Sequence, residues 1–293
     1  MQEITILSGK GGTGKTSVTA ALASLAKSAV FCDNDVDAAD LHIIFNPEIQ
    51  ETNTFSSGWK ANINRQICKN CGICIHYCHF DAIRYNNKRE VTIDAFQCEG
   101  CRLCERICPA NAIVSEKNEN NMWFVSDSRF GKLVHAQMGP GEENSGKLVS
   151  LVRKKAKEIA SVQKLDYIIN DGPPGIGCAT ISSLSGTNKV LLVIEPTKSG
   201  LHDVQRLVEL IESFNAEIYA VINKFDISAE ISGLISAYLT LKRIPLLAEI
   251  PFDKEMVEAM IKGKTIIEYN SGSEISQQIQ KIWNKIKEDD KIN

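Results

Sequence analysis

Five short apolar runs recur along the chain, and segments of helical periodicity lie between most of them. The segments that open with these runs are residues 3–8, 29–41, 165–177, 189–196 and 216–223. In the second and third segments the apolar run ends in acidic residues. Helical spacing follows at residues 15–27, 141–160, 201–214 and 273–293. Continuous apolar runs are typical of strands buried on both faces. The alternation therefore predicts an α/β fold, a doubly wound parallel sheet whose ligand lies at the C-terminal strand edge.

Two further segments depart from this alternation. Residues 122–138 alternate apolar and polar positions, which predicts a hairpin with its turn near residues 128–131. In the helix expected at 141–160, one face gathers apolar side chains, so we expect its basic face to be exposed to solvent. The apolar face consists of Leu148, Val152, Ala156 and Ile159.

A glycine-rich loop joins the first strand to the first helix. Residues 9–16 read GKGGTGKT and fit the phosphate-binding pattern G-x-x-x-x-G-K-[ST]. Glycines allow backbone N–H groups to surround phosphate oxygens, and the helix N-terminus adds its positive dipole end. Lys15 is expected to reach the outer phosphates, and the Thr16 hydroxyl to bind Mg²⁺.

The loop has an additional lysine, Lys10, and two of the predicted strands end in aspartates. K-G-G-x-G-K-[ST] resembles the deviant Walker A loop of the superfamily that includes MinD, ParA, Mrp and the nitrogenase iron protein. The resemblance implies a homodimer in which Lys10 reaches the partner's phosphates and acts as an arginine finger does. It also implies that Asp35 positions the attacking water. Asp37 either assists this site or caps the short helix that follows.

The same resemblance extends to the magnesium and nucleotide ligands. Asp33 is expected in the Mg²⁺ shell, together with Thr16 and with Asp171 of the Walker B-like strand at 165–177. The expected ATP-binding residues are Gly9, Gly11, Gly12, Thr13, Gly14, Lys15, Thr16, Ser17, Gly172 and Asn223.

The base to be recognised is ambiguous from the sequence. Residues 223–226, N-K-F-D, resemble the guanine-reading motif of GTPases, but MinD-like ATPases have an adenine-contacting asparagine at this point. The loop type favours ATP, with Asn223 as a base contact. Residues 250–253 resemble a second base-side loop, and a plain strand-to-helix turn would have the same pattern.

Eight cysteines form an internal repeat. Residues 68–83 and 98–113 align after a shift of 30 residues, and each contains C-x₂-C-x₂-C-x₃-C, the run of bacterial ferredoxins with 4Fe–4S clusters. In that arrangement the fourth cysteine of each run binds the other cluster. One ligand set is then Cys68, Cys71, Cys74 and Cys108, and the other is Cys98, Cys101, Cys104 and Cys78. Zinc is the competing metal, since C-x₂-C pairs also bind zinc.

Three residues near these patterns remain open. His79 stands where the second run has Pro109, so it either tunes one cluster or is a solvated side chain. Cys32 fits a buried strand position. Cys178 lies seven residues after Asp171, where the nitrogenase iron protein has a cysteine that bridges subunits.

The order of the motifs predicts two domains. The cysteine runs interrupt the nucleotide-binding pattern, so we expect a discontinuous P-loop domain at 1–57 and 118–293 and a ferredoxin-like α+β insert at 58–117. Residues 56–64 and 116–121 are expected to be linkers.

Composition limits the class of protein. The net charge of -3 does not favour nucleic-acid binding, and no apolar stretch approaches the length of a membrane span. The N-terminus lacks the features of a signal peptide. We therefore expect a cytoplasmic protein, in which ten cysteines favour metal ligation over disulfides.

Together these features predict a redox-coupled ATPase. ATP-dependent switching of a homodimer would be coupled to electron transfer through two 4Fe–4S clusters, toward an unidentified client. The alternatives are an ATP-dependent carrier or assembly factor for metal clusters, and a nucleotide-gated interaction protein with structural clusters.

Overall fold

A computed structural model describes residues 1–56, 58–139 and 145–288 of the chain. Contacts divide it into two compact units. The sheet unit comprises Met1–Thr52, Trp123–Ala136 and Ser145–Asn293, and the cysteine unit comprises Asn53–Met122 and Gln137–Asn144. The boundaries expected at 58 and 117 fall inside the cysteine unit, and residue 57 lies outside the described residues.

The sheet unit is built on a nine-stranded sheet, in the order β13-β12-β11-β1-β10-β2-β9-β8-β3. Its strands are β1 (Gln2–Ser8), β2 (Ala29–Asp33), β3 (Glu48–Phe55), β8 (Asn121–Ser128), β9 (Gly131–Gln137), β10 (Tyr167–Pro174), β11 (Lys189–Ile194), β12 (Glu217–Asn223) and β13 (Leu246–Ile250). The strands from β13 to β9 pair in parallel. The predicted parallel α/β sheet is confirmed, and β8 and β9 adjoin the expected turn.

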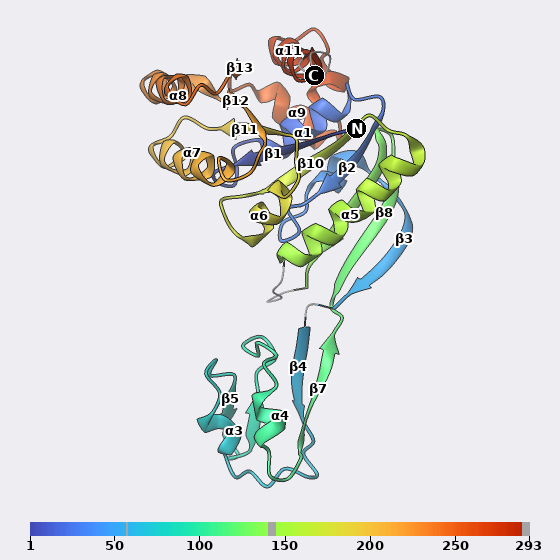
Figure 1. Ribbon diagram of the computed structural model, residues 1–293, viewed down its shortest axis with the longest axis vertical. Coiled ribbons are helices and arrows are strands. Elements are labelled where there is room, and N and C mark those ends of the chain that lie inside the picture. The colour runs from blue at the N-terminus through green and yellow to red at the C-terminus, as the bar shows by residue number, and fades with distance from the viewer. Residues whose placement is uncertain (57, 140–144, 289–293) are drawn as a thin grey trace. The chain divides into compact units, whose positions relative to one another are not determined.

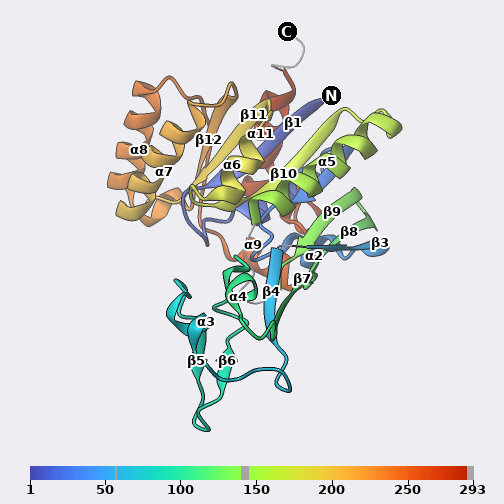
Figure 2. The same ribbon diagram turned by 60° about the horizontal axis from the view of Figure 1, so that its bottom comes forward.

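Helices cover both faces of this sheet (Figures 1 and 2). Figure 1 shows α5, α6, α7 and α8 along one face, with α1 and α11 on the other. The helices are α1 (Lys15–Ala23), α2 (Leu41–Phe45), α5 (Ser145–Gln163), α6 (Cys178–Leu184), α7 (Lys198–Ile211), α8 (Ala229–Leu241), α9 (Lys254–Ile261), α10 (Ile266–Tyr269) and α11 (Glu274–Glu288). Among the described residues, no helix combines the length and hydropathy needed to cross a membrane.

Alternation along the central strands explains the double covering. In β11, Leu191 and Val193 belong to the core beneath α1 and α11, whereas Val190 and Leu192 belong to the core beneath α7 and α8. Both faces are dry, so the strand has no polar face and appears in the sequence as an unbroken apolar run.

The cysteine unit has its own small sheets and core. In it β4 (Gly58–Ile63) pairs antiparallel with β7 (Ile113–Asn118), and β5 (Ile83–Tyr85) with β6 (Val91–Ile93). The expectation of linkers at 56–64 and 116–121 was wrong, because the described parts of both segments contribute to strands. Residues 58–60 of the first segment pair with residues 116–118 of the second, and Ala61 is buried, a role that polar composition alone does not reveal.

The 30-residue repeat of the sequence is also a repeat of conformation. Helices α3 (Ile73–His76) and α4 (Leu103–Ile107) begin 30 residues apart, as do β5 and β7. Positive φ angles repeat at the same offset, at Gly72 (74°) and Arg102 (61°), and at Asp81 (52°) and Asn111 (48°). Each cysteine run therefore folds as the same loop-helix-turn-strand unit.

The helix expected at 141–160 differs from the prediction in its bounds and in the exposure of one basic residue. It begins at Ser145, and residues 141–144 lie outside the described part. Arg153 is buried rather than solvated, because its guanidinium donates to Glu3 Oε1 at 2.7 Å and to the Ser182 carbonyl. A buried carboxylate needs such a partner. Of the helix expected at 273–293, residues 289–293 lie outside the described part.

Candidate functional site

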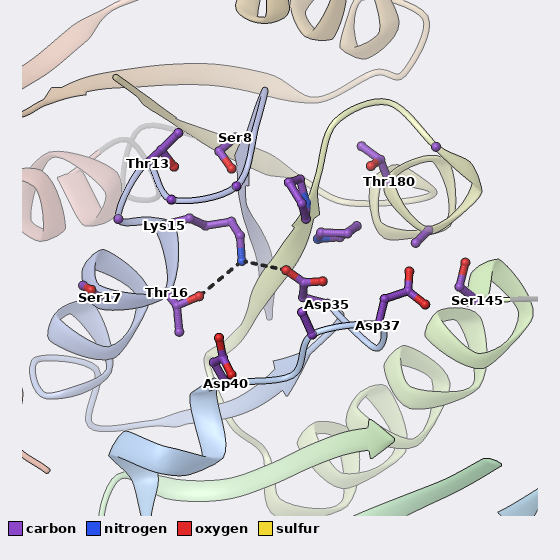
Figure 3. A pocket seen from close by; sticks show the side chains of 18 of the residues that line it. Ser8, Thr13, Lys15, Thr16, Ser17, Asp35, Asp37, Asp40, Ser145 and Thr180 are labelled. Carbon is purple, nitrogen blue, oxygen red and sulfur yellow. Dashed lines mark hydrogen bonds and ion pairs between the residues drawn. The ribbon is translucent and has the colours of Figure 1, made fainter. Parts of the chain in front are cut away.

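The phosphate-binding sequence forms a loop between β1 and α1, at the rim of a cavity of about 600 Å³ (Figure 3). Gly12 and Gly14 have φ angles of 79° and 91°, which favour glycine. A Cβ on Gly14 would also overlap the side-chain amide of Asn223. The cavity is lined by Gly11, Gly12, Thr13, Gly14, Lys15, Thr16 and Ser17 of the loop and α1.

Lys15 points into this cavity from the first turn of α1 (Figure 3). Its Nζ is 3.0 Å from Asp171 Oδ2 and 3.8 Å from Asp35 Oδ2. The Thr16 hydroxyl donates to Asp171 Oδ2 at 2.7 Å. Burial lowers the pKa of Lys15, but the carboxylates of Asp171, Asp35 and Asp33 outweigh burial and raise it. The ammonium is therefore charged in a nearly buried position.

Parallel pairing brings the aspartates together. Asp171 on β10 stands in register with Asp33 on β2, so two strand ends deliver two carboxylates to one edge. Burial, and then the charge of Asp171, raise the pKa of Asp33 well above its usual range. Asp33 accepts hydrogen bonds from the N–H groups of Leu41 at 3.0 Å and Asp35 at 3.2 Å. These bonds tie the start of α2 to the end of β2.

Asp35 and Asp37 lie at the cavity wall after β2. Burial raises the pKa of Asp35 to about 6, with Lys15 opposing and Asp171 adding to the shift. Asp40, not Asp37, occupies the position before α2, and its side chain makes no capping hydrogen bond. Of the two roles left open for Asp37, the structure excludes helix capping.

Lys10 is held outside the cavity lining by two residues beyond β11. Its Nζ is 2.7 Å from Glu195 Oε2 and donates to Thr197 Oγ1 at 2.9 Å. Glu195 Oε1 pairs at the same time with Lys224 Nζ at 2.7 Å. Burial raises the pKa of Glu195, but hydrogen bonds from the two lysines outweigh burial and lower it.

Two residues of the N-K-F-D segment contact the phosphate loop, and the aspartate contacts the segment after β13. Asn223 Nδ2 donates to the Thr13 carbonyl at 2.7 Å, and Lys224 Nζ donates to the Gly12 carbonyl at 3.0 Å. Asp226 Oδ1 accepts from the Phe252 N–H at 2.7 Å. None of these three side chains is among the described residues that line the cavity.

The remaining predicted residues lie beneath or beside the cavity. Asp33 and Asp171 are fully buried behind Lys15. Gly172 lies within β10, where a Cβ would overlap Leu7. Gly9 is packed on α7, because a Cβ there would stand 2.5 Å from the Asp203 side chain.

Several residues of the site were not predicted. Thr19, one turn beyond Thr16 on α1, donates to Asp171 Oδ1 at 2.7 Å, so helical spacing offered a signal for it. The cavity also has walls from distant elements, whose positions depend on tertiary packing. These are Ser8, Asp40, Ser145, Pro173, Pro174, Gly177, Cys178, Thr180 and Met260.

The cysteine unit holds a second cavity. Its lining includes Cys74, Cys78, Cys98, Cys101 and Cys104. Burial raises the pKa of Cys74, and the charges of Cys108, Cys71 and Cys68 add to the shift. Burial and then Cys98 and Cys101 raise the pKa of Cys104 to about 11. Seven cysteines of the two runs thus lie close enough to act on one another, and the eighth, Cys78, lines the cavity.

All ten cysteines are unpaired thiols. Cys32 is buried in β2, as predicted, while Cys178 is exposed at the start of α6. Among the described residues, no three Cys, His, Asp or Glu side chains are placed to hold one metal ion. A 4Fe–4S cluster asks for a different arrangement, since each of its four thiolates binds a different iron.

Comparisons with known proteins find relatives of this chain by sequence and by fold. An uncharacterised protein of Methanocaldococcus jannaschii is 33% identical over 98% of this chain and 97% of its own length. A MinD structure with Mg-ADP from Pyrococcus horikoshii superposes with a TM-score of 0.60 at 21% identity, covering 97% of this chain and 95% of that one. An iron-sulfur cluster carrier protein of Rickettsia bellii is 33% identical over 39% of this chain and 37% of its own length.

The family profile described as the CobQ/CobB/MinD/ParA nucleotide binding domain matches residues 4–266, a span that includes the phosphate loop, the aspartates and the base-side segment. The chain therefore belongs to the CobQ/CobB/MinD/ParA nucleotide-binding family.

Proposed function

We propose that this protein binds and hydrolyses ATP in a homodimer and couples that cycle to electron transfer through two 4Fe–4S clusters. The observation that carries the proposal is the pairing, within one chain, of two features. Lys15, Thr16 and Asp171 converge beside a phosphate loop, and a separate unit gathers eight cysteines in ferredoxin order.

The side chains around Lys15 suit a triphosphate with Mg²⁺. Lys15 pairs with the carboxylates of Asp171 and Asp35, so a phosphate would offer its ammonium a further anionic partner. The Thr16 hydroxyl and the carboxylates of Asp33 and Asp171 are hard oxygen ligands of the kind Mg²⁺ prefers. Bound Mg²⁺ would neutralise charge between the phosphates. Asp35, at the cavity wall, would orient the attacking water molecule.

Lys10 is suited to act on a neighbouring subunit. Its present partner Glu195 has a second lysine, Lys224, at 2.7 Å. Lys10 can therefore leave without exposing an unpaired carboxylate, and the cost of moving it is small. In a dimer the released ammonium would add positive charge where hydrolysis spreads negative charge.

The cysteine unit fits two cubane clusters in its donor set. Four thiols of one proposed set, Cys78, Cys98, Cys101 and Cys104, line one cavity together with Cys74 of the other set. The other set, Cys68, Cys71, Cys74 and Cys108, is joined by mutual electrostatic effects on Cys74. Crowded, partly buried thiolates without a metal would be costly, whereas a coordinating centre deprotonates them outright. When bound, such clusters supply one-electron redox chemistry.

A second candidate function is the carriage or assembly of metal clusters. The local similarity to a protein named an iron-sulfur cluster carrier favours it. Under this proposal the clusters of the cysteine unit would supply electrons to the transfer or stabilise the fold.

The two candidates can be separated with anaerobically purified protein. The first test is iron and sulfide content with calorimetric titration of ATP and Mg²⁺. Full clusters with ATP binding and hydrolysis support the shared part of the proposal, and failure to bind or hydrolyse ATP would refute it. Transfer of a labile cluster to an apo-acceptor, dependent on ATP, would favour the carrier function.

A further inference from the structure

We infer that Asn223 and Lys224 are positioning residues that clamp the phosphate loop, so that N-K-F-D orients phosphate-binding N–H groups and does not read a guanine base. The inference rests on the proposed nucleotide-binding function and assigns the segment a part in it. Two donors from the end of β12 reach two successive carbonyls of the loop, at 2.7 Å to Thr13 and 3.0 Å to Gly12.

Because the peptide group is planar, hydrogen bonds to these carbonyls also fix the directions of the neighbouring N–H groups. In a trans peptide the C=O of one residue points opposite to the N–H of the next. A donor that fixes the Gly12 carbonyl therefore fixes the Thr13 N–H in the reverse direction. The bond to the Thr13 carbonyl does the same for the Gly14 N–H. Thr13 and Gly14 both line the cavity, where N–H groups can bind phosphate oxygens.

Close packing holds the Asn223 amide against the phosphate loop. Asn223 is only 6% exposed. Its amide lies so close to Gly14 that any Cβ there would overlap it. The left-handed φ of 91° at Gly14 is the conformation that starts α1. The clamp thus acts on the residue where the loop becomes helix.

The other polar groups of the segment are also committed to protein. Lys224 also pairs with Glu195 at 2.7 Å, which holds its ammonium in place. Asp226, the residue that would accept hydrogen bonds from guanine, already accepts from the Phe252 N–H at 2.7 Å. The amide of Asn223, the ammonium of Lys224 and Oδ1 of Asp226 are thus engaged with protein groups, as a positioning role requires.

Tripolyphosphate, which has no base, separates a clamp from a base reader. Its affinity is measured by calorimetry on the full chain with intact clusters, beside those of ADP and GDP, with Mg²⁺ present. Lys224→Met removes the donor to Gly12 at a partly exposed position. Loss of a hydrogen bond from a charged donor predicts about tenfold or greater weakening for all three ligands, by a common factor. Lys224→Arg, which keeps a charged donor, should restore most of the affinity.

The matched control is Asp226→Asn, which keeps an oxygen to accept from Phe252. It should leave tripolyphosphate affinity and the ADP to GDP ratio unchanged. The inference is overturned if Lys224→Met weakens ADP or GDP alone and leaves tripolyphosphate unchanged, or if Asp226→Asn selectively weakens GDP. A thermal melt of each variant separates loss of fold from loss of affinity. Wild-type protein that binds none of the three ligands would overturn the proposed function, and the clamp with it.

Discussion

Replacement of Lys10 by alanine should separate nucleotide binding from hydrolysis. The change removes a 2.7 Å ion pair to Glu195 and a 2.9 Å hydrogen bond to Thr197. Glu195 still has Lys224 as an ion-pair partner after this change. Because a partly exposed ion pair contributes about 0.2–1 kcal/mol, the free energy of unfolding should fall by at most about 1 kcal/mol. Lys10 does not line the cavity, so ATP affinity should change little. A finger-type cation is worth about 10³–10⁵ in rate, and hydrolysis should fall by that order.

A mixing assay tests whether Lys10 acts on the partner. Lys10→Ala protein and Asp35→Ala protein should each be inactive alone. If Lys10 acts across the dimer, a mixed dimer has one complete site, with Asp35 from one subunit and Lys10 from the other. Half the dimers in an equal mixture are mixed, so about a quarter of the wild-type rate should return. If Lys10 acts within its own subunit, every site lacks one residue and no activity returns.

The control is Lys27→Ala, which removes an exposed lysine beyond the end of α1. It should retain wild-type hydrolysis and binding. The reasoning is refuted if Lys10→Ala hydrolyses ATP within a few-fold of wild type. Loss of ATP binding in Lys10→Ala would also refute it, because the present geometry places that lysine outside the cavity lining.

Three further predictions concern separate parts of the molecule. Cys78→Ser should lower the iron content from about eight atoms per chain toward about four, whereas Cys32→Ala should not change it, and equal losses would contradict the proposed ligand sets. Gly14→Ala should abolish nucleotide affinity, because its φ of 91° and the overlap with Asn223 exclude a Cβ; Gly233→Ala, with nothing within 4 Å, is the matched control. Burial and then the charge of His42 lower the pKa of His135 to about 4. The unfolded chain therefore binds a proton that the folded chain does not between that value and about 6.5, and stability should fall as pH decreases through this window. Urea unfolding should show a loss at pH 5, relative to pH 7, that is up to about 2 kcal/mol larger in wild type than in His135→Gln, and equal losses would contradict the assignment.

The main elements of the fold could be predicted because local patterns determine them. Apolar runs such as that of β11 have no polar face, and glycines such as Gly12 and Gly14 mark a loop that needs positive φ. The 30-residue cysteine repeat of the sequence likewise corresponds to a repeat of helices, strands and backbone angles in the structure. In each case the physical cause lies within a few neighbouring residues.

What the sequence did not predict depends on long-range contacts. Glu195 follows β11 and gives no local sign that it will hold both Lys10 and Lys224. Arg153 belongs to a helix face that is basic in sequence, yet Glu3 on β1 draws it into the interior. The strands β4 and β7 are polar and looked like linkers, because their pairing partners are about 55 residues apart in the chain. Helical spacing could have indicated Thr19, which was overlooked.

An anaerobic redox titration, with and without a non-hydrolysable ATP analogue and Mg²⁺, tests the central claim most directly. If nucleotide binding is coupled to the clusters, at least one potential should shift by about 60 mV or more, a tenfold change for a one-electron couple. Lys15→Ala protein, with clusters intact, should show no such shift. Potentials that stay unchanged in wild type while the analogue is demonstrably bound would contradict the coupling of ATP to electron transfer.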